Sequence, residues 1–349
     1  FTRNVAYPGL FILIAISITC ALFPKETNHV LTSVQTGIYK DLSWSYIFLV
    51  SFFFIFLCIL AFSKIGNIRL GPDNSTPQYG FFSWIAMLFA AGMGIGLMYF
   101  GVAEPMSHYV NPALPSMVNK AKEAQLATFF HWGIHAWSIF AVMGLILAYF
   151  SFRYKLPLSI RSGLYPILKE RINGKIGDIV DIFALVSPFF GIAPSLGFGV
   201  VQLNAGLVHL GVLKDSNFFF QCIIIIVVSS VAILSAVAGV NKGVKRLSEI
   251  NLGLAVLLLI FVLLLGPTTF LLSAFSEGIG YYINQFPDLT FNTFAFEKAG
   301  QAWFTNWTVM YWAWWISWAP FVGLFIARIS KGRTIREYIL AVLLVPSLF

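Results

Sequence analysis

Charged side chains and cysteines are both scarce in this sequence. Only 10% of the 349 residues are charged, whereas a soluble domain carries about 25%. The three cysteines, Cys20, Cys58 and Cys222, all lie inside apolar runs, so they predict no disulfide framework. These scarcities argue against a water-soluble domain and against a small disulfide-stapled fold.

Long apolar runs take the place of charge, and 58% of the residues are hydrophobic. A run of about 20 apolar residues is long enough to cross a hydrocarbon core about 30 Å thick. The runs predict an all-α, polytopic membrane protein. The expected spans lie near residues 7–24, 45–62, 81–101, 126–150, 180–211, 219–239, 252–275, 302–327 and 337–349. The last run is too short to span and the first residue is Phe, so we expect a fragment that lacks further C-terminal helices.

The net charge of +8 comes from basic residues between the expected spans. If the N-terminus is cytoplasmic, sixteen of the 22 Lys and Arg residues fall in cytoplasmic segments and six in external ones. Such a bias is the orientation signal of membrane proteins. We therefore expect a cytoplasmic N-terminus and no nucleic-acid partner.

Acidic and basic residues avoid the middle of the expected spans. Asp178 and Asp181 lie at the entry to the fifth span and Glu104 at the exit of the third. Charges within a membrane usually mark ion or proton pathways. The absence of charged side chains within the spans argues against a carboxylate-based proton pump. It also indicates that any substrate has little net charge or is held by groups other than charged side chains.

Three glycines alternate in the middle of the third span: Gly92, Gly94 and Gly96. Each costs a helix about 1 kcal/mol relative to alanine. This predicts an unwound stretch, which is tolerated at membrane depth where it lines a cavity or is buried in protein. A close helix–helix contact through small residues is the alternative. Leu97 follows where a dinucleotide fingerprint would continue, and no strand precedes, so that motif is excluded.

The eighth span has an unusual centre. Its tryptophans are Trp312, Trp314, Trp315 and Trp318. Membrane tryptophans normally lie at the interface, so these favour a binding role. Pro320 removes a helical hydrogen bond and predicts a break after Ser317. Tyr311, Trp315 and Trp318 share one helix face and could form an aromatic wall.

Aromatic residues recur in the fourth span, at Trp132, Trp137 and Phe140. Aromatic cages bind quaternary ammonium because ring faces attract cations, although ordinary packing would also explain these rings. His131 and His135 have the i, i+4 spacing of metal ligands, but Trp stands where a zinc-protease motif needs Glu, so zinc is disfavoured. The two interrupted helices lie five spans apart, which predicts inverted repeats with a site where they meet.

Several long motifs together resemble one known family. They are Gly92–Pro105, Trp307–Gly323 and Ala327–Glu337, supported by His131–Trp137, Gly197–Gly206 and Gly239–Asn251. In this order they are similar to the betaine/carnitine/choline transporters. The resemblance implies a LeuT-type inverted-repeat core preceded by two extra helices. The parts would be two N-terminal helices (1–80), a first five-helix repeat (81–275), and an interfacial segment with the start of the second repeat (276–349).

The resemblance also implies a homotrimer in the bacterial inner membrane, with alternating access and a role in osmoprotection. The substrate would be a quaternary-ammonium osmolyte, with glycine betaine as the first candidate, taken up with sodium and without another cofactor. The implied substrate-binding residues are Trp132, Trp137, Phe140, Trp314, Trp315, Trp318, Gly92, Met93, Gly94 and Gly96. Choline-selective members carry Asp at the position of Gly96, so Gly indicates a zwitterion. Phe140 departs from the Tyr common in betaine carriers.

A sodium site implied by the resemblance would use backbone near Ala90 and Met93. A second family site uses two threonines, which we align with Pro188 and Ile192, where no hydroxyl is present; Ser187 and Ser195 lie nearby. Hard cations need oxygen ligands, so this site is absent or rebuilt.

Several other functions stay open. One is a sodium-independent exchanger or proton-coupled carrier for choline- or carnitine-type compounds. A passive channel would need a polar or charged pore lining, which the sequence does not show. A non-transporting sensor is a further alternative. An enzyme is disfavoured because no nucleophile–base pair, metal cluster or phosphate loop is evident.

Overall fold

The chain is helical along most of its length. A computed structural model describes residues 2–92, 94–114 and 117–348. The helices are α1 (Arg3–Leu22), α2 (Pro24–Phe62), α3 (Phe81–Gly92), α4 (Ile95–Val110), α5 (Lys120–Trp132), α6 (Ile134–Arg153), α7 (Tyr165–Leu168), α8 (Lys175–His209), α9 (Phe218–Val237), α10 (Lys245–Leu265), α11 (Thr268–Phe291), α12 (Lys298–Phe304), α13 (Met310–Ile329) and α14 (Ile335–Leu344). Within the described ranges the only extended pairing is an isolated bridge between Arg69 and Thr334.

Seven helical segments of the described chain are long and apolar enough to cross a membrane. They are Arg3–Leu22, Pro24–Phe62, Lys120–Arg153, Lys175–His209, Phe218–Val237, Lys242–Leu265 and Lys298–Ile329. These correspond to seven of the expected spans, so the prediction of a polytopic helical membrane protein is confirmed. The third expected span is divided between α3 and α4, and the ninth corresponds to the ten-residue α14.

Two expected boundaries are wrong. α2 has 39 residues and starts at Pro24, so the stretch 25–44, expected as a connection, is helical. The seventh span ends at Leu265, ten residues before its expected end at 275. Gly266 and Pro267 interrupt the helix there, because proline lacks the amide hydrogen that the helix would need.

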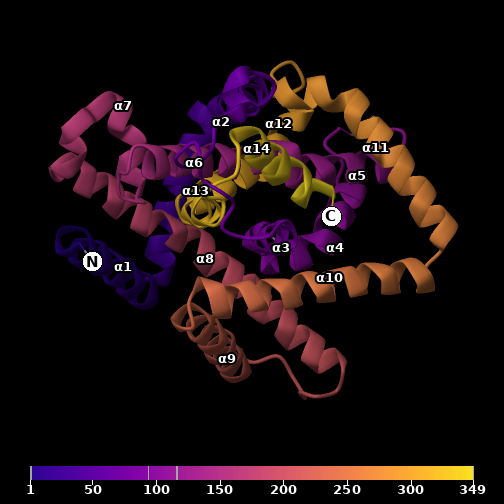
Figure 1. The fold of residues 1–349 in the computed structure, drawn as a ribbon. Coiled ribbons are helices and arrows are strands. Elements are labelled where there is room, and N and C mark those ends of the chain that lie inside the picture. Colours follow the sequence, from indigo (N-terminus) through magenta and orange to yellow (C-terminus); the bar gives the residue numbers. More distant parts are fainter. Residues whose placement is uncertain (1, 93, 115–116, 349) are drawn as a thin grey trace.

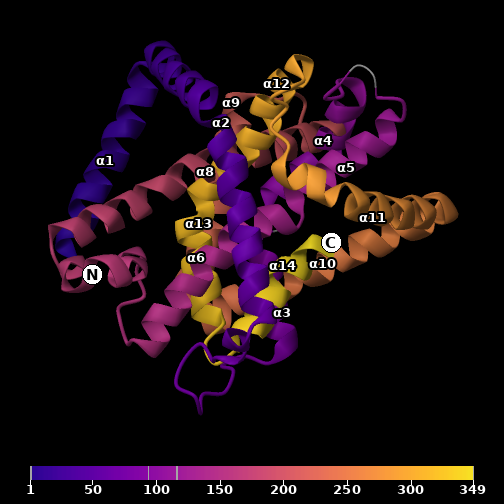
Figure 2. The ribbon, with the colours of Figure 1, turned by 90° about the horizontal axis from the view of Figure 1, so that it is seen from above.

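The centre of the molecule is formed by α6 and α13, which lie side by side in both ribbon views (Figures 1 and 2). Small residues allow this close approach. A Cβ atom added to Gly323 would lie 2.4 Å from Met143 Cγ, and one added to Gly144 would lie 2.3 Å from the Tyr338 hydroxyl. That hydroxyl donates a 3.1 Å hydrogen bond to the carbonyl of Ala141, which ties α14 to α6.

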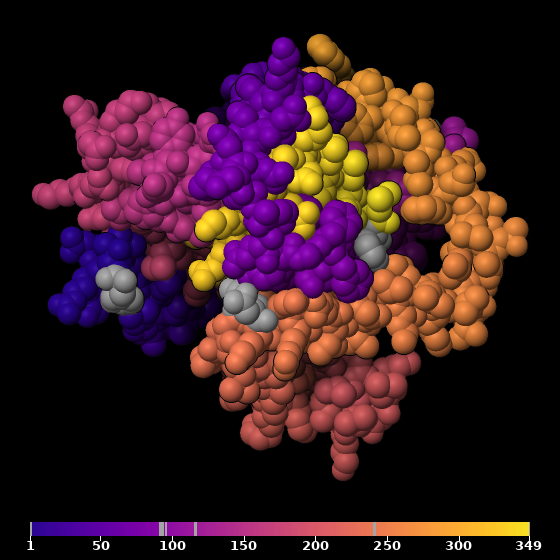
Figure 3. All heavy atoms as spheres, viewed as in Figure 1, coloured from indigo at the N-terminus to yellow at the C-terminus, as the bar shows by residue number. Residues whose placement is uncertain are grey.

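The outer helices surround this centre. α14 packs against α6 and α2, and the C-terminal atoms are visible on the face shown in Figure 3, where α10 and α11 form a rim around one side. None of the residues of α9 is buried, and apolar side chains such as Val237 and Phe218 are about four-fifths exposed. An apolar surface of this kind suits contact with lipid.

Two ion pairs join the segment between α6 and α8 to the first turns of α8. Arg161 bonds Asp178 at 2.7 Å and Asp181 at 2.6 Å. Both carboxylates lie in the first two turns of α8, in agreement with the expected helix entry. Burial opposes the charge of Arg161, but the two carboxylates outweigh it and raise the pKa of the guanidinium. The pairs fix the start of α8, one of the walls of the site described below.

Candidate functional site

The third span is interrupted, as its glycines predict. α3 ends at Gly92 and α4 begins at Ile95. Gly94, with φ −124° and ψ −146°, is not helical. Met93 lies outside the described residues, so its expected contacts with substrate and sodium stay predictions, and so does the role of Gly92.

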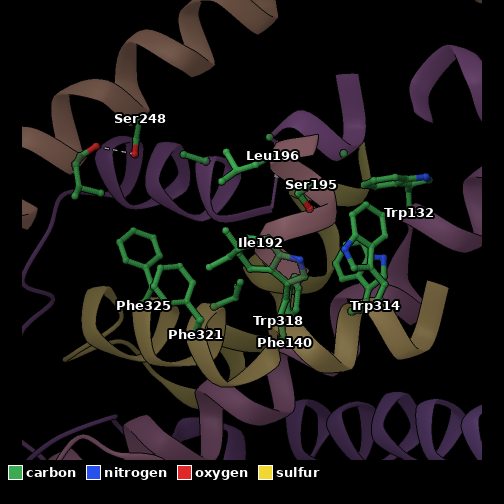
Figure 4. A pocket seen from close by; sticks show the side chains of 16 residues that line it. Trp132, Phe140, Ile192, Ser195, Leu196, Ser248, Trp314, Trp318, Phe321 and Phe325 are labelled. Carbon is green, nitrogen blue, oxygen red and sulfur yellow. Dashed lines mark hydrogen bonds between the residues drawn. The ribbon is translucent and has the colours of Figure 1, made fainter. Parts of the chain in front are cut away.

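A cavity of about 480 Å³ opens beside this interruption. Its lining residues come from α3, α4, α5, α6, α8, α10 and α13 and from the segment just before α10: Ala90, Gly94, Gly96, Trp132, Phe140, Ile192, Ser195, Leu196, Val244, Ser248, Trp314, Trp315, Trp318, Phe321, Val322 and Phe325. None of these described lining residues is charged. Figure 4 shows Trp132 and Trp314 toward one end of the cavity, Phe321 and Phe325 toward the other, and Trp318 between them.

The aromatic rings from the fourth and eighth spans form one cluster around Trp315. The ring centroid of Trp315 lies 4.7 Å from Phe140, 5.6 Å from Trp137 and 5.8 Å from Trp132. Trp137 is fully buried and does not line the cavity; it packs behind Phe140, at 5.7 Å. Trp314 completes the wall, 6.2 Å from Trp132. Of the expected binding residues Trp132, Trp137, Phe140 and Trp315, all but Trp137 therefore face the cavity.

Gly96 stands close to two indole rings. A Cβ atom there would lie 2.8 Å from Cη2 of Trp314 and 3.4 Å from Cη2 of Trp132. A side chain at this position must therefore displace an indole. This steric constraint is separate from the electrostatic role that the resemblance implies for Gly96, which stays a prediction.

The expected break in the eighth span is wrong. α13 continues through Pro320 to Ile329. The irregular turn lies earlier, as a π-helix over Thr305–Val309. The continuous helix places Trp314, Trp318, Phe321 and Phe325 on the cavity. Their spacing of three or four residues is a signal that could have identified Phe321 and Phe325 from the sequence.

The fourth span has a break that the sequence analysis missed. α5 ends at Trp132 and α6 begins at Ile134, with Gly133 between them at φ −88° and ψ −150°. A Cβ atom on Gly133 would lie 2.4 Å from the carbonyl oxygen of Phe129. The single glycine in an aromatic run was the available signal. The break sets Trp132 at an angle to Phe140.

The expectation that no charged side chain lies deep in the bundle is wrong for Glu104. This residue is fully buried, in the middle of α4 and not at its exit, because α4 continues to Val110. Its carboxylate contacts His108, His131, Trp132 and Tyr311. Tyr311 therefore belongs to this cluster and not to the expected aromatic wall of α13.

Glu104, His108 and His131 could hold a metal ion by geometry, since one ligand atom of each lies within 4.8 Å of the others. The same atoms are already joined by direct hydrogen bonds. His131 and His135 do not share a site, because His135 faces Thr290, with 2.9 Å between Nε2 and Oγ1. His131 and His135, which the sequence analysis disfavours as a zinc site, thus have different partners in the fold.

Oxygen groups for sodium are few around the cavity. Ala90 lines it, but Pro188 and Ile192 offer no hydroxyl. The hydroxyls of Ser195 and Ser248 line the cavity and donate to the carbonyls of Gly191 and Val244, both at 2.8 Å. Ser187 donates to the carbonyl of Ser317 at 3.0 Å, and the oxygen of each hydroxyl keeps lone pairs for a cation. The sodium sites implied by the resemblance stay predictions.

Comparison with known proteins agrees with this architecture. A model of the "betaine/carnitine/choline family transporter" family matches residues 4–349. An uncharacterized transporter of Haemophilus influenzae is 54% identical over 341 residues, covering 97% of this chain and 51% of that protein. A glycine betaine transporter of Acinetobacter baylyi is 47% identical, covering 98% of this chain and 52% of that protein. A high-affinity choline transport protein of Escherichia coli is 44% identical, covering 99% of this chain and 51% of that protein.

The chain therefore spans about half the length of these curated relatives. The family match covers almost every residue, including the glycine motif of the third span and the tryptophan motif of the eighth. The chain belongs to the betaine/carnitine/choline transporter family.

Proposed function

We propose that the whole protein imports a small quaternary-ammonium solute, with glycine betaine as its preferred substrate. The observation that carries this proposal is the cavity of about 480 Å³ walled by Trp132, Phe140, Trp314 and Trp315, with no charged side chain among its described lining residues. A methylated ammonium donates no hydrogen bonds, and ring faces attract its charge. The cavity thus offers the interaction that this cation can use.

A zwitterion fits the site better than a bare cation. Nε1 of Trp314 is buried and has no acceptor among the described residues. An unpaired buried donor is costly, and a substrate carboxylate would satisfy it. Gly96 places no carboxylate in the cavity wall, so a substrate that carries one meets no like charge at that position. Both features support betaine over choline.

Transport would proceed by alternating access of a LeuT-type core, with residues 81–275 as the first repeat and 276–349 starting the second. The interruption between α3 and α4 supports this arrangement, because broken helices of this fold place backbone groups at the site. We further propose a homotrimer in the bacterial inner membrane. Its N-terminus would be cytoplasmic, and the bias of basic residues supports this orientation. No cofactor other than a coupling ion is proposed.

Sodium is the proposed coupling ion, with backbone near Ala90 and Met93 among its ligands. The alternative is a sodium-independent exchanger or a proton-coupled carrier for choline- or carnitine-type compounds. That alternative is favoured by one observation: Pro188 and Ile192, which align with the two threonines of the second family site, have no hydroxyl.

Calorimetric titration of the purified full-length protein tests the substrate class. Betaine is expected to bind saturably, choline to bind more weakly, and acetate, which lacks the ammonium, to produce no heat of binding. Absence of binding by both ammonium compounds, or displacement of betaine by equimolar acetate, would contradict the proposal.

A further inference from the structure

We infer that Glu104 is a positioning residue for the substrate cavity: it fixes the indole of Trp132 from behind and places a negative charge on the side of that ring away from the substrate. The inference rests on the proposed function, since it explains how a cavity without a charged lining holds a cation. Glu104 itself does not line the cavity.

The two carboxylate oxygens of Glu104 are fully engaged. Oε1 lies 2.7 Å from Nδ1 of His131 and 3.2 Å from Nε2 of His108. Oε2 accepts from Nε1 of Trp132 at 2.6 Å and from the hydroxyl of Tyr311 at 2.5 Å. The partners come from α4, α5 and α13, so one carboxylate joins three helices that bound the cavity.

The direction of each hydrogen bond follows from the network. An indole nitrogen can only donate. Nε1 of Trp303 donates to Nδ1 of His108 at 3.1 Å, so the hydrogen of the neutral His108 ring is on Nε2 and points to Glu104. Nδ1 of His131 donates to the carboxylate of Glu104, which accepts only, and the hydroxyl of Thr308, 2.9 Å from Nε2, can supply the hydrogen of that second contact. Glu104 therefore receives four donors, and the ionised carboxylate is the form that accepts them all.

Trp132 connects this carboxylate with the cavity. Its nitrogen bonds Glu104, while the ring lines the cavity 5.8 Å from Trp315. In Figure 4 the indole nitrogen of Trp132 lies at the end of the ring away from the other labelled side chains. Donation to an anion polarises the indole, and a buried charge is weakly screened. Both effects strengthen the attraction of the ring for a cation.

The same cluster could instead bind a metal ion, but its hydrogen bonds disfavour that role. A metal would need the lone pairs of Nδ1 of His131 and Nε2 of His108, which here hold the hydrogens directed at Glu104. Betaine uptake by the full-length protein is therefore expected to be unchanged after treatment with a zinc chelator. Uptake abolished by the chelator and restored by zinc would overturn the positioning role.

A double-mutant cycle on the full-length protein tests the inference directly. We expect Glu104→Gln to raise the dissociation constant of betaine at least tenfold, and Trp132→Phe, which keeps a ring but loses the hydrogen bond, to raise it about threefold to tenfold. In the Trp132→Phe background, Glu104→Gln is expected to add less than threefold. Glu277→Gln is the matched control, since this exposed carboxylate pairs with Lys122 at 2.8 Å and does not line the cavity, and it should leave binding unchanged.

Equal effects of Glu104→Gln in both backgrounds, or no effect in the wild type, would overturn the inference. If Glu104→Gln does not reach the membrane, an unchanged dissociation constant in Trp132→Phe would overturn it as well. Trp315→Ala, measured alongside, separates the two proposals. If Trp315→Ala weakens betaine binding while Glu104→Gln does not, the positioning role fails alone; if neither weakens it, the proposed substrate site fails too.

Discussion

The rings of Phe140 and Trp315 lie 4.7 Å apart with their planes inclined by 36°. One belongs to α6 and the other to α13, so the aromatic wall exists only while these two helices stay in close contact. That contact depends on Gly144 and Gly323, where an added Cβ atom would have no room. Packing between two helices is thus coupled to the geometry of the site.

Gly323→Val is expected to lower the melting temperature of the full-length protein and to weaken betaine binding together. Overpacking a close contact costs about 1–3 kcal/mol, and the displaced α13 carries Trp315 with it. The thermal unfolding of purified protein in detergent measures the first effect, and calorimetry the second. Gly280→Val is the control, because nothing lies within 4 Å of a Cβ atom there. Equal melting temperatures for both variants would contradict the role of the glycine contact.

Gly96→Ala is expected to raise the betaine concentration for half-maximal uptake roughly fivefold, which corresponds to a loss of about 1 kcal/mol. The added methyl group would meet Trp314 at 2.8 Å, so that indole must move. Uptake by proteoliposomes measures the change. Gly101→Ala, on the same helix with open space around the Cβ position, serves as control. If both variants have the same betaine concentration for half-maximal uptake, the close contact between Trp314 and Gly96 does not affect transport.

Gly96→Asp is expected to shift preference from betaine toward choline. A carboxylate at this position would repel the carboxylate of betaine and attract the bare cation of choline. The ratio of the two inhibition constants in a competition assay is the measurement, with Gly96→Asn as the neutral control for the steric effect. A ratio that changes equally in both variants would assign the shift to size and not to charge.

Sodium coupling predicts that an inward sodium gradient drives concentrative betaine uptake by proteoliposomes of the full-length protein. Replacing sodium by potassium should abolish accumulation. Accumulation that is unaffected by this replacement would reject symport with sodium. Stimulation by betaine or choline loaded inside the vesicles would then identify an exchanger, and stimulation by a proton gradient a proton-coupled carrier.

The sequence predicts the spans and the break at Gly94 well, because long apolar runs and closely spaced glycines act locally. It fails at Pro320, where the rest of α13 and its packing against α6 keep the helix continuous. A proline can be accommodated when neighbouring residues supply compensating contacts, and such contacts come from distant parts of the chain.

The residues next to Glu104 in the sequence did not predict its buried position either. It looks terminal if the third span is counted as one helix from residue 81 to 101. The interruption after Gly92 starts a new helix at Ile95, and this places Glu104 in its middle. Its partners His131 and Tyr311 are 27 and 207 residues away. Only the fold shows that they converge on one carboxylate.

The dissociation constant of betaine for Trp315→Ala, compared with wild type, tests the central claim most directly. Trp315 contacts the three other rings of the cluster, and loss of a cation–π partner in a desolvated site costs about 2 kcal/mol, so roughly a thirtyfold increase is expected. Trp315→Phe, which keeps a ring face, should lose less, and Trp44→Ala, at an exposed indole on α2, should bind as wild type does. A dissociation constant for Trp315→Ala equal to that of wild type would contradict the aromatic cavity as the substrate site.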